Sequence, residues 1–215
     1  LYEKAAKKGN SKAQINLALM YALGDGIEPN LPRAVELFTK AANQDDAEAQ
    51  YNLGLLYSQG RGVPQDKEKA VELFTKSAAK GNVEAQFNLG VLYQNEHDDE
   101  KAFKYYQMAA DKGNVQAQFN LGVIYSRGIE GVLEKDMSKS AHFFQLAADK
   151  GEVDALINLG TLYARGEGVP LDKQKTVELY QKAADLNSPK AMFNLGVMYS
   201  RGDGVQQDKE RAAQF

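Results

Sequence analysis

The chain has 215 residues, with 26 Lys and Arg against 29 Asp and Glu and a net charge of -3. This balance provides no broad basic field for a nucleic-acid backbone, so we expect no nucleic-acid partner. No apolar run approaches the roughly 20 residues of a membrane helix, and the chain shows no signal-like segment, so we expect no membrane insertion. The absence of cysteine excludes disulfides, thiol catalysis and cysteine metal sites, but leaves the compartment unknown.

A twelve-residue pattern recurs six times along the chain. The copies are "AQINLALMYALG" at 13–24, "AQYNLGLLYSQG" at 49–60, "AQFNLGVLYQNE" at 85–96, "AQFNLGVIYSRG" at 117–128, "ALINLGTLYARG" at 155–166 and "AMFNLGVMYSRG" at 191–202. Their first alanines are separated by 36, 36, 32, 38 and 36 residues. A period in this range is typical of stacked helical hairpins.

Each pattern predicts a first helix, here called helix A, because apolar residues such as Leu121, Ile124 and Tyr125 share one helical face. A second apolar run, such as "AVELFTKSAA" at 70–79, predicts helix B. Helix B has one apolar and one charged stripe and should face solvent, whereas helix A is apolar almost all round. We therefore expect the A helices to line the inner, concave side of the stack.

The helix boundaries carry their own chemical signals. Six residues are expected to cap the start of helix B, where a side-chain oxygen can accept a backbone N–H: Asn30, Asp66, Asp98, Asp136, Asp172 and Asp208. Residues that tolerate a left-handed backbone follow each helix B: Gly9, Asp45, Gly81, Gly113, Gly151 and Asn187.

Helix A keeps a small residue at its centre, although glycine there costs about 1 kcal/mol relative to alanine. The positions are Ala18, Gly54, Gly90, Gly122, Gly160 and Gly196. We expect helix B to cross there, with an aromatic ring from Phe38, Phe74, Tyr106, Phe144 or Tyr180 above the small residue. Since Ala18 is one of the six, the position should require smallness, so that alanine is tolerated and leucine is not.

The residues A-x-x-x-L-G-x-x-Y-x-x-G-x-G-V, followed by D-x-x-x-A and A-A-x-x-G, are nearly complete at 49–82. With this motif the chain resembles the Sel-1-like repeat family, a relative of tetratricopeptide repeats. The resemblance implies an all-α, right-handed superhelical solenoid of about six stacked helix-turn-helix repeats, each of ~36 residues. It also implies an adaptor in protein complexes. The loop at 94–101 is four residues shorter than the pattern, and the loop after 126 is two residues longer.

We interpret residues 1–215 as a single repeat array. Residues 1–12 would end a preceding repeat, 191–215 would form a partial one, and the full repeats would be 13–48, 49–84, 85–116, 117–154 and 155–190. Because each repeat contacts only its neighbours, we expect an elongated stack. No polar capping repeat is visible at either end, so we expect the chain to be part of a longer protein.

Signals for catalysis or metal binding are weak. His97, in "EHDDE", could join a weak cation site, but a solvated loop is the favoured reading, and His142 should lie on the surface. The paired loop glycines lack a preceding strand and a Walker lysine, so they should be turn glycines. "SAAK" at 77–80 fits the serine-x-x-lysine signature of β-lactamases without its companion motifs, and packing explains Ser77. We expect no enzyme activity and no cofactor.

An asparagine recurs at one position of helix A: Asn16, Asn52, Asn88, Asn120, Asn158 and Asn194. These amides could hold a ligand's backbone or carboxylate, as in related tetratricopeptide domains, or could bond neighbouring helices. Beside them runs an apolar stripe, either core or binding surface: Ile15, Tyr51, Phe87, Phe119, Ile157 and Phe193.

We expect a partner protein or peptide on the concave face, contacted by Phe87, Asn88, Phe119, Asn120, Asn52 and Asn158. A binder of small ligands or cell-wall fragments in the same groove is the alternative, and a β-lactamase-like hydrolase is a remote one. The oligomeric state is left open.

Overall fold

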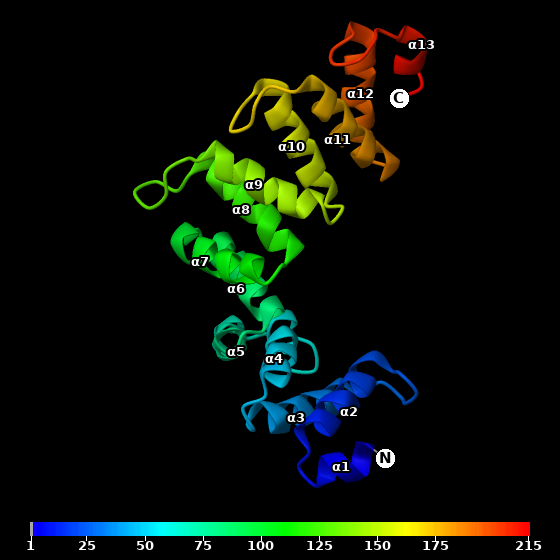
Figure 1. Ribbon diagram of the computed structural model, residues 1–215. Helices are drawn as coiled ribbons and strands as arrows, with labels where there is room; N and C mark the ends of the chain where they lie inside the picture. Colours follow the sequence, from blue (N-terminus) through cyan, green and yellow to red (C-terminus); the bar gives the residue numbers. More distant parts are fainter. Residues whose placement is uncertain (1) are drawn as a thin grey trace. The chain divides into compact units, whose positions relative to one another are not determined.

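The computed structural model describes residues 2–215; Leu1, where the repeat array was expected to begin, lies outside the described residues. The described chain folds into helices joined by short loops (Figure 1). They are α1 (Tyr2–Lys7), α2 (Ser11–Leu23), α3 (Leu31–Ala42), α4 (Ala47–Gln59), α5 (Lys67–Ala79), α6 (Val83–Asn95), α7 (Asp99–Asp111), α8 (Val115–Arg127), α9 (Met137–Ala148), α10 (Val153–Arg165), α11 (Lys173–Asp185), α12 (Pro189–Arg201) and α13 (Lys209–Ala212). The predicted all-α class is confirmed.

The helices form two compact units, of which unit 1 extends to His97 and unit 2 runs from Asp98 to Phe215. Unit 1 contains α1 to α6 and unit 2 contains α7 to α13. The division falls in the loop that the sequence shortens. Within each unit every helix packs on its neighbours in sequence, in the alternating order of helix A and helix B that a solenoid requires.

The predicted boundaries of helix B are confirmed. All six expected residues are N-caps whose side chains accept a backbone N–H three residues on, as Asp66 does from Lys69 N at 2.9 Å. The six residues expected to be left-handed have φ angles from 62° to 91°. Helix A has side-chain caps of its own that the sequence analysis missed: Asn10, Asp46, Asn82, Asn114 and Ser188.

At Gly54, Gly122 and Gly160 the small residue of helix A lies beneath the predicted aromatic ring of helix B. A Cβ atom on Gly122 would lie 2.5 Å from Cδ1 of Phe144, and one on Gly160 would lie 2.7 Å from Cε1 of Tyr180. Such approaches are shorter than a normal contact, so an alanine at Gly122 requires the Phe144 ring to shift. Ala18, the one alanine at this position, is fully buried in the first repeat.

The paired loop glycines have separate roles. The first, such as Gly60, ends helix A with a left-handed backbone, and its N–H bonds to Leu56 O. The second, Gly62, has φ 74°, and a Cβ on it would lie 2.8 Å from Leu31 Cβ at the start of the preceding helix B. Gly168 approaches Met137 in the same way. The predicted turn role is confirmed, and the second glycine also lets successive repeats approach closely.

The shortened loop and the lengthened loop differ in backbone structure. In the shortened loop, His97 takes the left-handed conformation with φ 60° directly before the cap Asp98. In the lengthened loop, Ile129 and Leu133 form an isolated antiparallel bridge, with Ile129 N donating to Leu133 O at 2.7 Å.

We predict that substitutions at Gly122 destabilise the protein in order of size. Leucine should cost about 1–3 kcal/mol or more through overpacking against Phe144. Alanine should also destabilise, because the clash at 2.5 Å outweighs its better helix propensity. Urea unfolding of each variant measures the free energy of unfolding.

Gly196→Ala is the matched control, because its Cβ would lie 3.2 Å from the nearest atom, Ala212 O. The packing account is contradicted if Gly122→Ala is as stable as Gly196→Ala.

Candidate functional site

The exposed side of each helix A carries the same four positions in order. These are a first-turn residue, the recurring asparagine, an apolar residue or threonine, and a last-turn residue. In α8 they are Gln116, Asn120, Val123 and Arg127, of which the first and last are exposed and the middle two are half-buried. These spacings of four, three and four keep all four residues on one side of the helix. We call this surface, formed in each unit by its own A helices, the A-face.

The asparagines of the A-face make different contacts. Asn52 Nδ2 donates to Glu48 O at 2.9 Å within its own helix, whereas Asn88 Nδ2 donates to Tyr51 Oη at 3.3 Å on the preceding helix A. Asn120 bonds the Tyr106 hydroxyl, whose pKa burial raises to about 12 although this bond lowers it. Asn88 and Asn120 therefore bond neighbouring helices, the structural role that the sequence left open, whereas Asn52 bonds only its own helix.

A buried glutamine, which the sequence analysis did not single out, joins helix A to the helix B before it in four repeats, those of α2, α4, α6 and α8. The side-chain Nε2 atoms donate to the last carbonyls of helix B, with Gln14 to Ala6 O at 3.1 Å, Gln50 to Ala42 O at 3.4 Å, Gln86 to Ala78 O at 3.0 Å and Gln118 to Ala110 O at 3.2 Å. These residues are 1 to 4% exposed. The recurrence of glutamine two places before asparagine was the available signal, since a buried amide must find partners.

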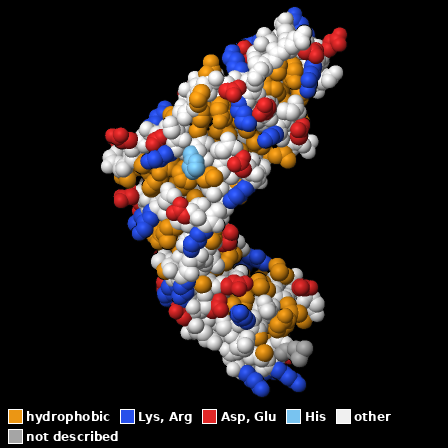
Figure 2. Space-filling model, viewed as in Figure 1, with side chains coloured by type: hydrophobic (Ala, Val, Ile, Leu, Met, Phe, Trp, Pro, Cys, Tyr) orange, Lys and Arg blue, Asp and Glu red, His pale blue; other side chains and the backbone are white. Residues whose placement is uncertain are grey.

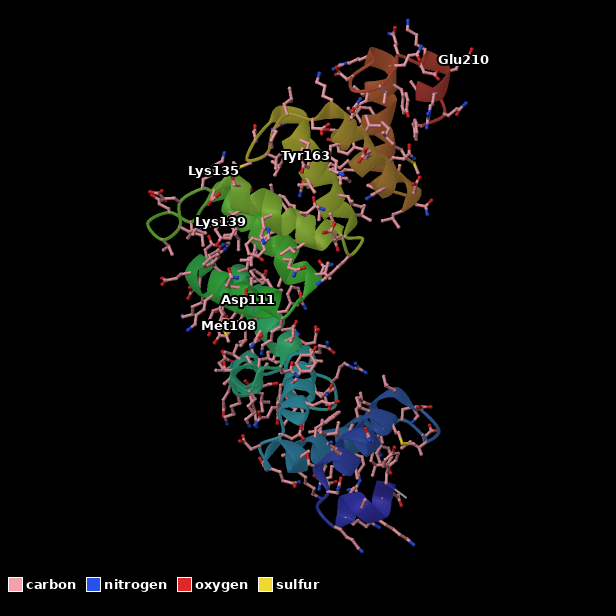
Figure 3. The ribbon with its side chains drawn as sticks, viewed as in Figure 1. Met108, Asp111, Lys135, Lys139, Tyr163 and Glu210 are labelled. Atoms are coloured by element: carbon pink, nitrogen blue, oxygen red, sulfur yellow. The ribbon has the colours of Figure 1, made fainter. Side chains whose placement is uncertain are left out.

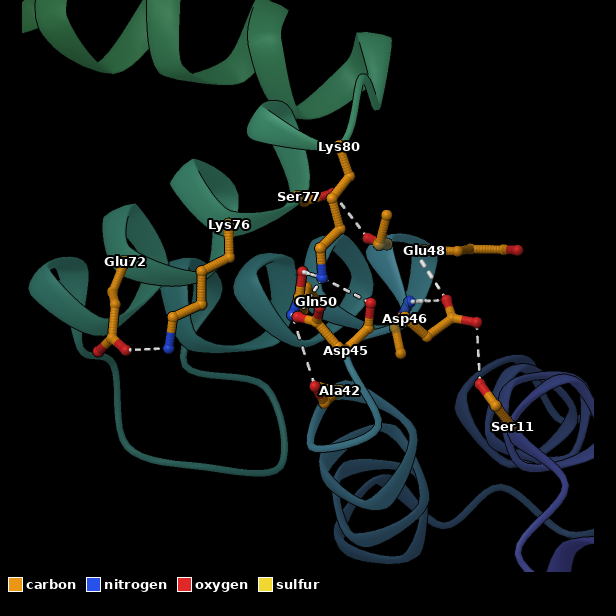
Figure 4. Close-up of polar contacts among 12 residues, drawn as sticks. Ser11, Ala42, Asp45, Asp46, Glu48, Gln50, Glu72, Lys76, Ser77 and Lys80 are labelled. Atoms are coloured by element: carbon orange, nitrogen blue, oxygen red, sulfur yellow. Dashed lines mark hydrogen bonds and ion pairs between the residues drawn. The ribbon is translucent and has the colours of Figure 1, made fainter.

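The "SAAK" segment belongs to the contacts between repeats (Figure 4). Ser77 is fully buried, and its hydroxyl donates to Ala47 O at 2.6 Å. Lys80 donates to Asp45 O at 2.6 Å and also pairs with the Asp45 carboxylate. That lysine lowers the pKa of Asp45, chiefly through the hydrogen bond between them. The predicted packing role of Ser77 is confirmed.

The apolar stripe beside the asparagines is mostly packed. Ile15 and Ile157 are buried, and Phe119 is half-buried against Phe144 with ring centroids 5.8 Å apart. Phe193 differs, because it is 70% exposed and lines a pocket of about 590 Å³ with Phe215. The stripe therefore includes core residues, half-buried residues and, at Phe193, an exposed residue.

Phe103, Tyr125 and Phe143 form an aromatic cluster among α7, α8 and α9. Tyr125 stacks on Phe143 at 5.5 Å and meets Phe103 edge-on at 5.7 Å. Lys139 Nζ lies 5.3 Å from the centre of the Tyr125 ring; Figure 3 labels this lysine on α9. His142 is exposed beside Phe143, as predicted, and Figure 2 shows a histidine among hydrophobic side chains in this region. These contacts join α7, α8 and α9 within unit 2.

Of the six residues predicted to bind a partner, Asn52, Phe87 and Asn88 lie in unit 1, and Phe119, Asn120 and Asn158 lie in unit 2. Every one of them is half-buried. Among residues 2–215 no group of three or more His, Cys, Asp or Glu is placed to hold a metal ion. Each helix in this range is too short or too polar to span a bilayer.

We predict that the buried glutamines differ in their contribution to stability. Gln50 bonds through both ends of its amide, because its Oε1 lies 3.5 Å from Lys80 Nζ, whereas Gln86 Oε1 is buried without a partner. Gln50→Leu should therefore destabilise the protein by about 1 kcal/mol more than Gln86→Leu, since only the latter also removes an unsatisfied group. Urea unfolding measures the difference.

Leucine is a fair replacement because Leu156 occupies the equivalent place in α10 and is 3% exposed. Equal losses of stability in the two variants would contradict the prediction.

Comparisons with known proteins agree with this architecture. A family model described as Sel1 repeat matches residues 1–10, 11–46, 47–82, 83–114, 115–152, 153–188 and 189–215. A comparison with curated proteins gave no match. Among solved structures, a protective antigen present in uropathogenic Escherichia coli strains and displaying an SLR fold is 31% identical over 99% of this chain, with a TM-score of 0.95. This chain covers 46% of that protein, about half its length.

Two further structures extend the comparison. A Sel1 repeat protein from Oxalobacter formigenes is 29% identical over 96% of this chain and 83% of its own, with a TM-score of 0.79. An immunity protein from Pseudomonas aeruginosa, 24% identical over 86% of this chain and 72% of its own at a TM-score of 0.51, shares the fold alone. The seven matched segments span the described chain and coincide with its helical hairpins. The chain therefore belongs to the Sel1 repeat family, whose members are generally scaffolds for protein interaction.

Proposed function

We propose that this chain is a non-catalytic scaffold that binds an extended segment of a partner protein on the A-face. The observation that carries the proposal is the row of half-buried asparagines whose amides are only partly used by the fold. Asn52 donates one bond within its own helix, although an asparagine amide has two donors and an acceptor oxygen. A peptide backbone, with its own N–H and C=O groups, can pair with both ends of such an amide.

The neighbouring residues suit an extended segment. Leu55, Val91, Val123 and Val197 are half-buried beside the asparagines, so each helix A offers a small apolar contact next to an orienting amide. Aromatic and aliphatic anchors beside a few well-placed polar groups are typical of binding surfaces. The repetition of this pair along successive A helices favours a ligand that is itself extended.

A small-ligand function has less support from the cavities. One pocket of about 600 Å³ lies among Arg127 and the loop residues Ile129 to Glu134, and the pocket at Phe193 has a similar volume. Neither is lined by an asparagine of the A-face. Small-molecule sites are enclosed pockets with convergent polar groups. The asparagine row instead follows an open surface, which favours a protein segment.

We predict that Asn52→Ala in unit 1 and Asn158→Ala in unit 2, made separately, each weaken partner binding to the A-face of the unit concerned by about 1 kcal/mol, since each removes an orienting hydrogen bond. A peptide selected from a displayed random library on the full chain serves as the ligand, and calorimetry measures its affinity. Asn88 and Asn120 are less clean choices, because each bonds a tyrosine hydroxyl and its loss would also disturb packing.

The unfolding midpoint of the Asn52→Ala variant should change little, because Asn52 bonds only its own helix. Asn43→Ala, at an exposed helix end away from the A-face, is the control for a surface asparagine. A large loss of stability with unchanged affinity would show that the asparagines are structural.

The proposal also includes the absence of catalysis. Ser77, the residue of the β-lactamase-like signature, is buried and donates to a backbone carbonyl, while Lys80 is engaged with Asp45. A nucleophile needs a nearby base and access to substrate. We therefore predict that the purified chain does not hydrolyse a chromogenic β-lactam. Hydrolysis that Ser77→Ala abolishes and Thr75→Ala, on the same helix, retains would contradict this.

A further inference from the structure

The last-turn position of the A-face has a different chemistry in the two units. In unit 2 it is an arginine on every helix A: Arg127 in α8, Arg165 in α10 and Arg201 in α12. In unit 1 the same position is uncharged: Leu23, Gln59 and Asn95. We call the three arginines the arginine row.

Helix stability does not account for the arginine row. A cation in the last turn interacts favourably with the helix dipole, by about 0.3–1 kcal/mol. However, α2, α4 and α6 have the same length and lack a last-turn cation. Two of these A helices end in the same glycine C-cap as α10 and α12. The repeat therefore forms equally well with a neutral residue at this place.

Contacts within the fold do not use all the hydrogen-bond donors of these arginines either. Arg127 is 49% exposed and lies 3.5 Å from Asp99, at the outer limit of a hydrogen bond. Arg165 is 65% exposed and approaches Glu167 only to 4.0 Å. Exposed pairs of this kind contribute little to stability. Most of the guanidinium donors therefore remain available, and these donors match the geometry of a carboxylate.

Each arginine of the row has an acidic neighbour. Asp99 lies 3.5 Å from Arg127, Glu167 lies 4.0 Å from Arg165, and Asp203, which pairs with Lys173, also interacts with Arg201. These contacts are exposed and long or shared, so each contributes little and an incoming carboxylate can replace it. The edge therefore carries one arginine per repeat, beside the asparagines, that can exchange its acidic partner.

We infer that the A-face of unit 2 binds an extended, acidic protein segment whose carboxylates pair with Arg127, Arg165 and Arg201. The inference rests on the proposed function and specifies the chemistry of the partner. A protein segment fits better than a nucleic acid, because the asparagines can pair with a peptide backbone. The nearby Asp99, Glu167 and Asp203, with the net charge of -3, oppose a dense polyanion.

A random peptide library displayed on phage and panned on the full chain tests the inference. In parallel, the library is panned on the triple variant Arg127→Gln, Arg165→Gln, Arg201→Gln. A matched control carries Lys104→Gln, Lys135→Gln and Lys182→Gln, three exposed lysines of unit 2 that lie outside its A helices. Both variants lose three positive charges from the same unit. The comparison therefore separates the effect of net charge on peptide binding from the effect of charge at the arginine row.

We expect acidic peptides to be enriched on the wild type and on the lysine control, and not on the arginine variant. By fluorescence polarisation, a selected peptide should bind the arginine variant about tenfold more weakly, as expected for the loss of three surface ion pairs. Its affinity should fall with salt for the wild type and respond less to salt for the arginine variant.

The other outcomes separate the two proposals. Enriched peptides without acidic residues, whose binding Asn158→Ala weakens, would leave the proposed function standing and overturn the acidic partner. A single-stranded oligonucleotide that displaces the selected peptide at equal concentration would overturn it in favour of nucleic acid. No enrichment above the blank surface would overturn both proposals.

Discussion

The crossing of helix B over a small residue of helix A is the constraint on which the rest of each repeat depends. At Gly122 and Gly160 the ring lies so close that not even a methyl group fits beneath it. Burial of an aromatic ring contributes about 1.5–3 kcal/mol, which exceeds the cost of glycine in a helix of about 1 kcal/mol. The close crossing lets a hairpin of two helices form a core with only one aromatic layer. It also fixes which sides of helix A stay free.

Repeats are joined to one another by a different set of contacts, most of them polar. Buried glutamines bond the last carbonyls of the preceding helix B, and Lys150 reaches back to Gly113 O at 2.7 Å. The second loop glycine lets the chain approach the start of the earlier helix B. Because buried polar groups left unpaired are costly, these bonds favour one register between neighbours. Among the asparagines of the A-face, Asn88 and Asn120 also bond a neighbouring helix, whereas Asn52 bonds only its own helix.

Because packing and the A-face use different residues of helix A, a repeat scaffold can acquire a binding surface without loss of fold. Packing uses the alanines, leucines, glycine and glutamine of helix A, which are buried. The A-face residues sit on the opposite side and can differ between repeats, as the change from Gln59 to Arg165 shows. Exposed positions tolerate substitution because it changes few contacts. Differences among repeats at these positions therefore report on the partner more than on the fold.

The sequence by itself determined the helical hairpins, their boundaries and the crossing. These features depend on contacts within a repeat, where the spacing of the chain fixes which side chains meet, as with Asp66 at its helix start and Phe144 over Gly122. Only the tertiary structure showed that Gln86 takes the buried polar role, and that Asn52 stays within its own helix while Asn88 bonds Tyr51. Glutamine recurs with the same period as asparagine in the first four patterns, so periodicity there cannot distinguish them. The angle of each side chain around the helix, and the distance to the neighbouring repeat, decide which amide is buried and which remains on the A-face.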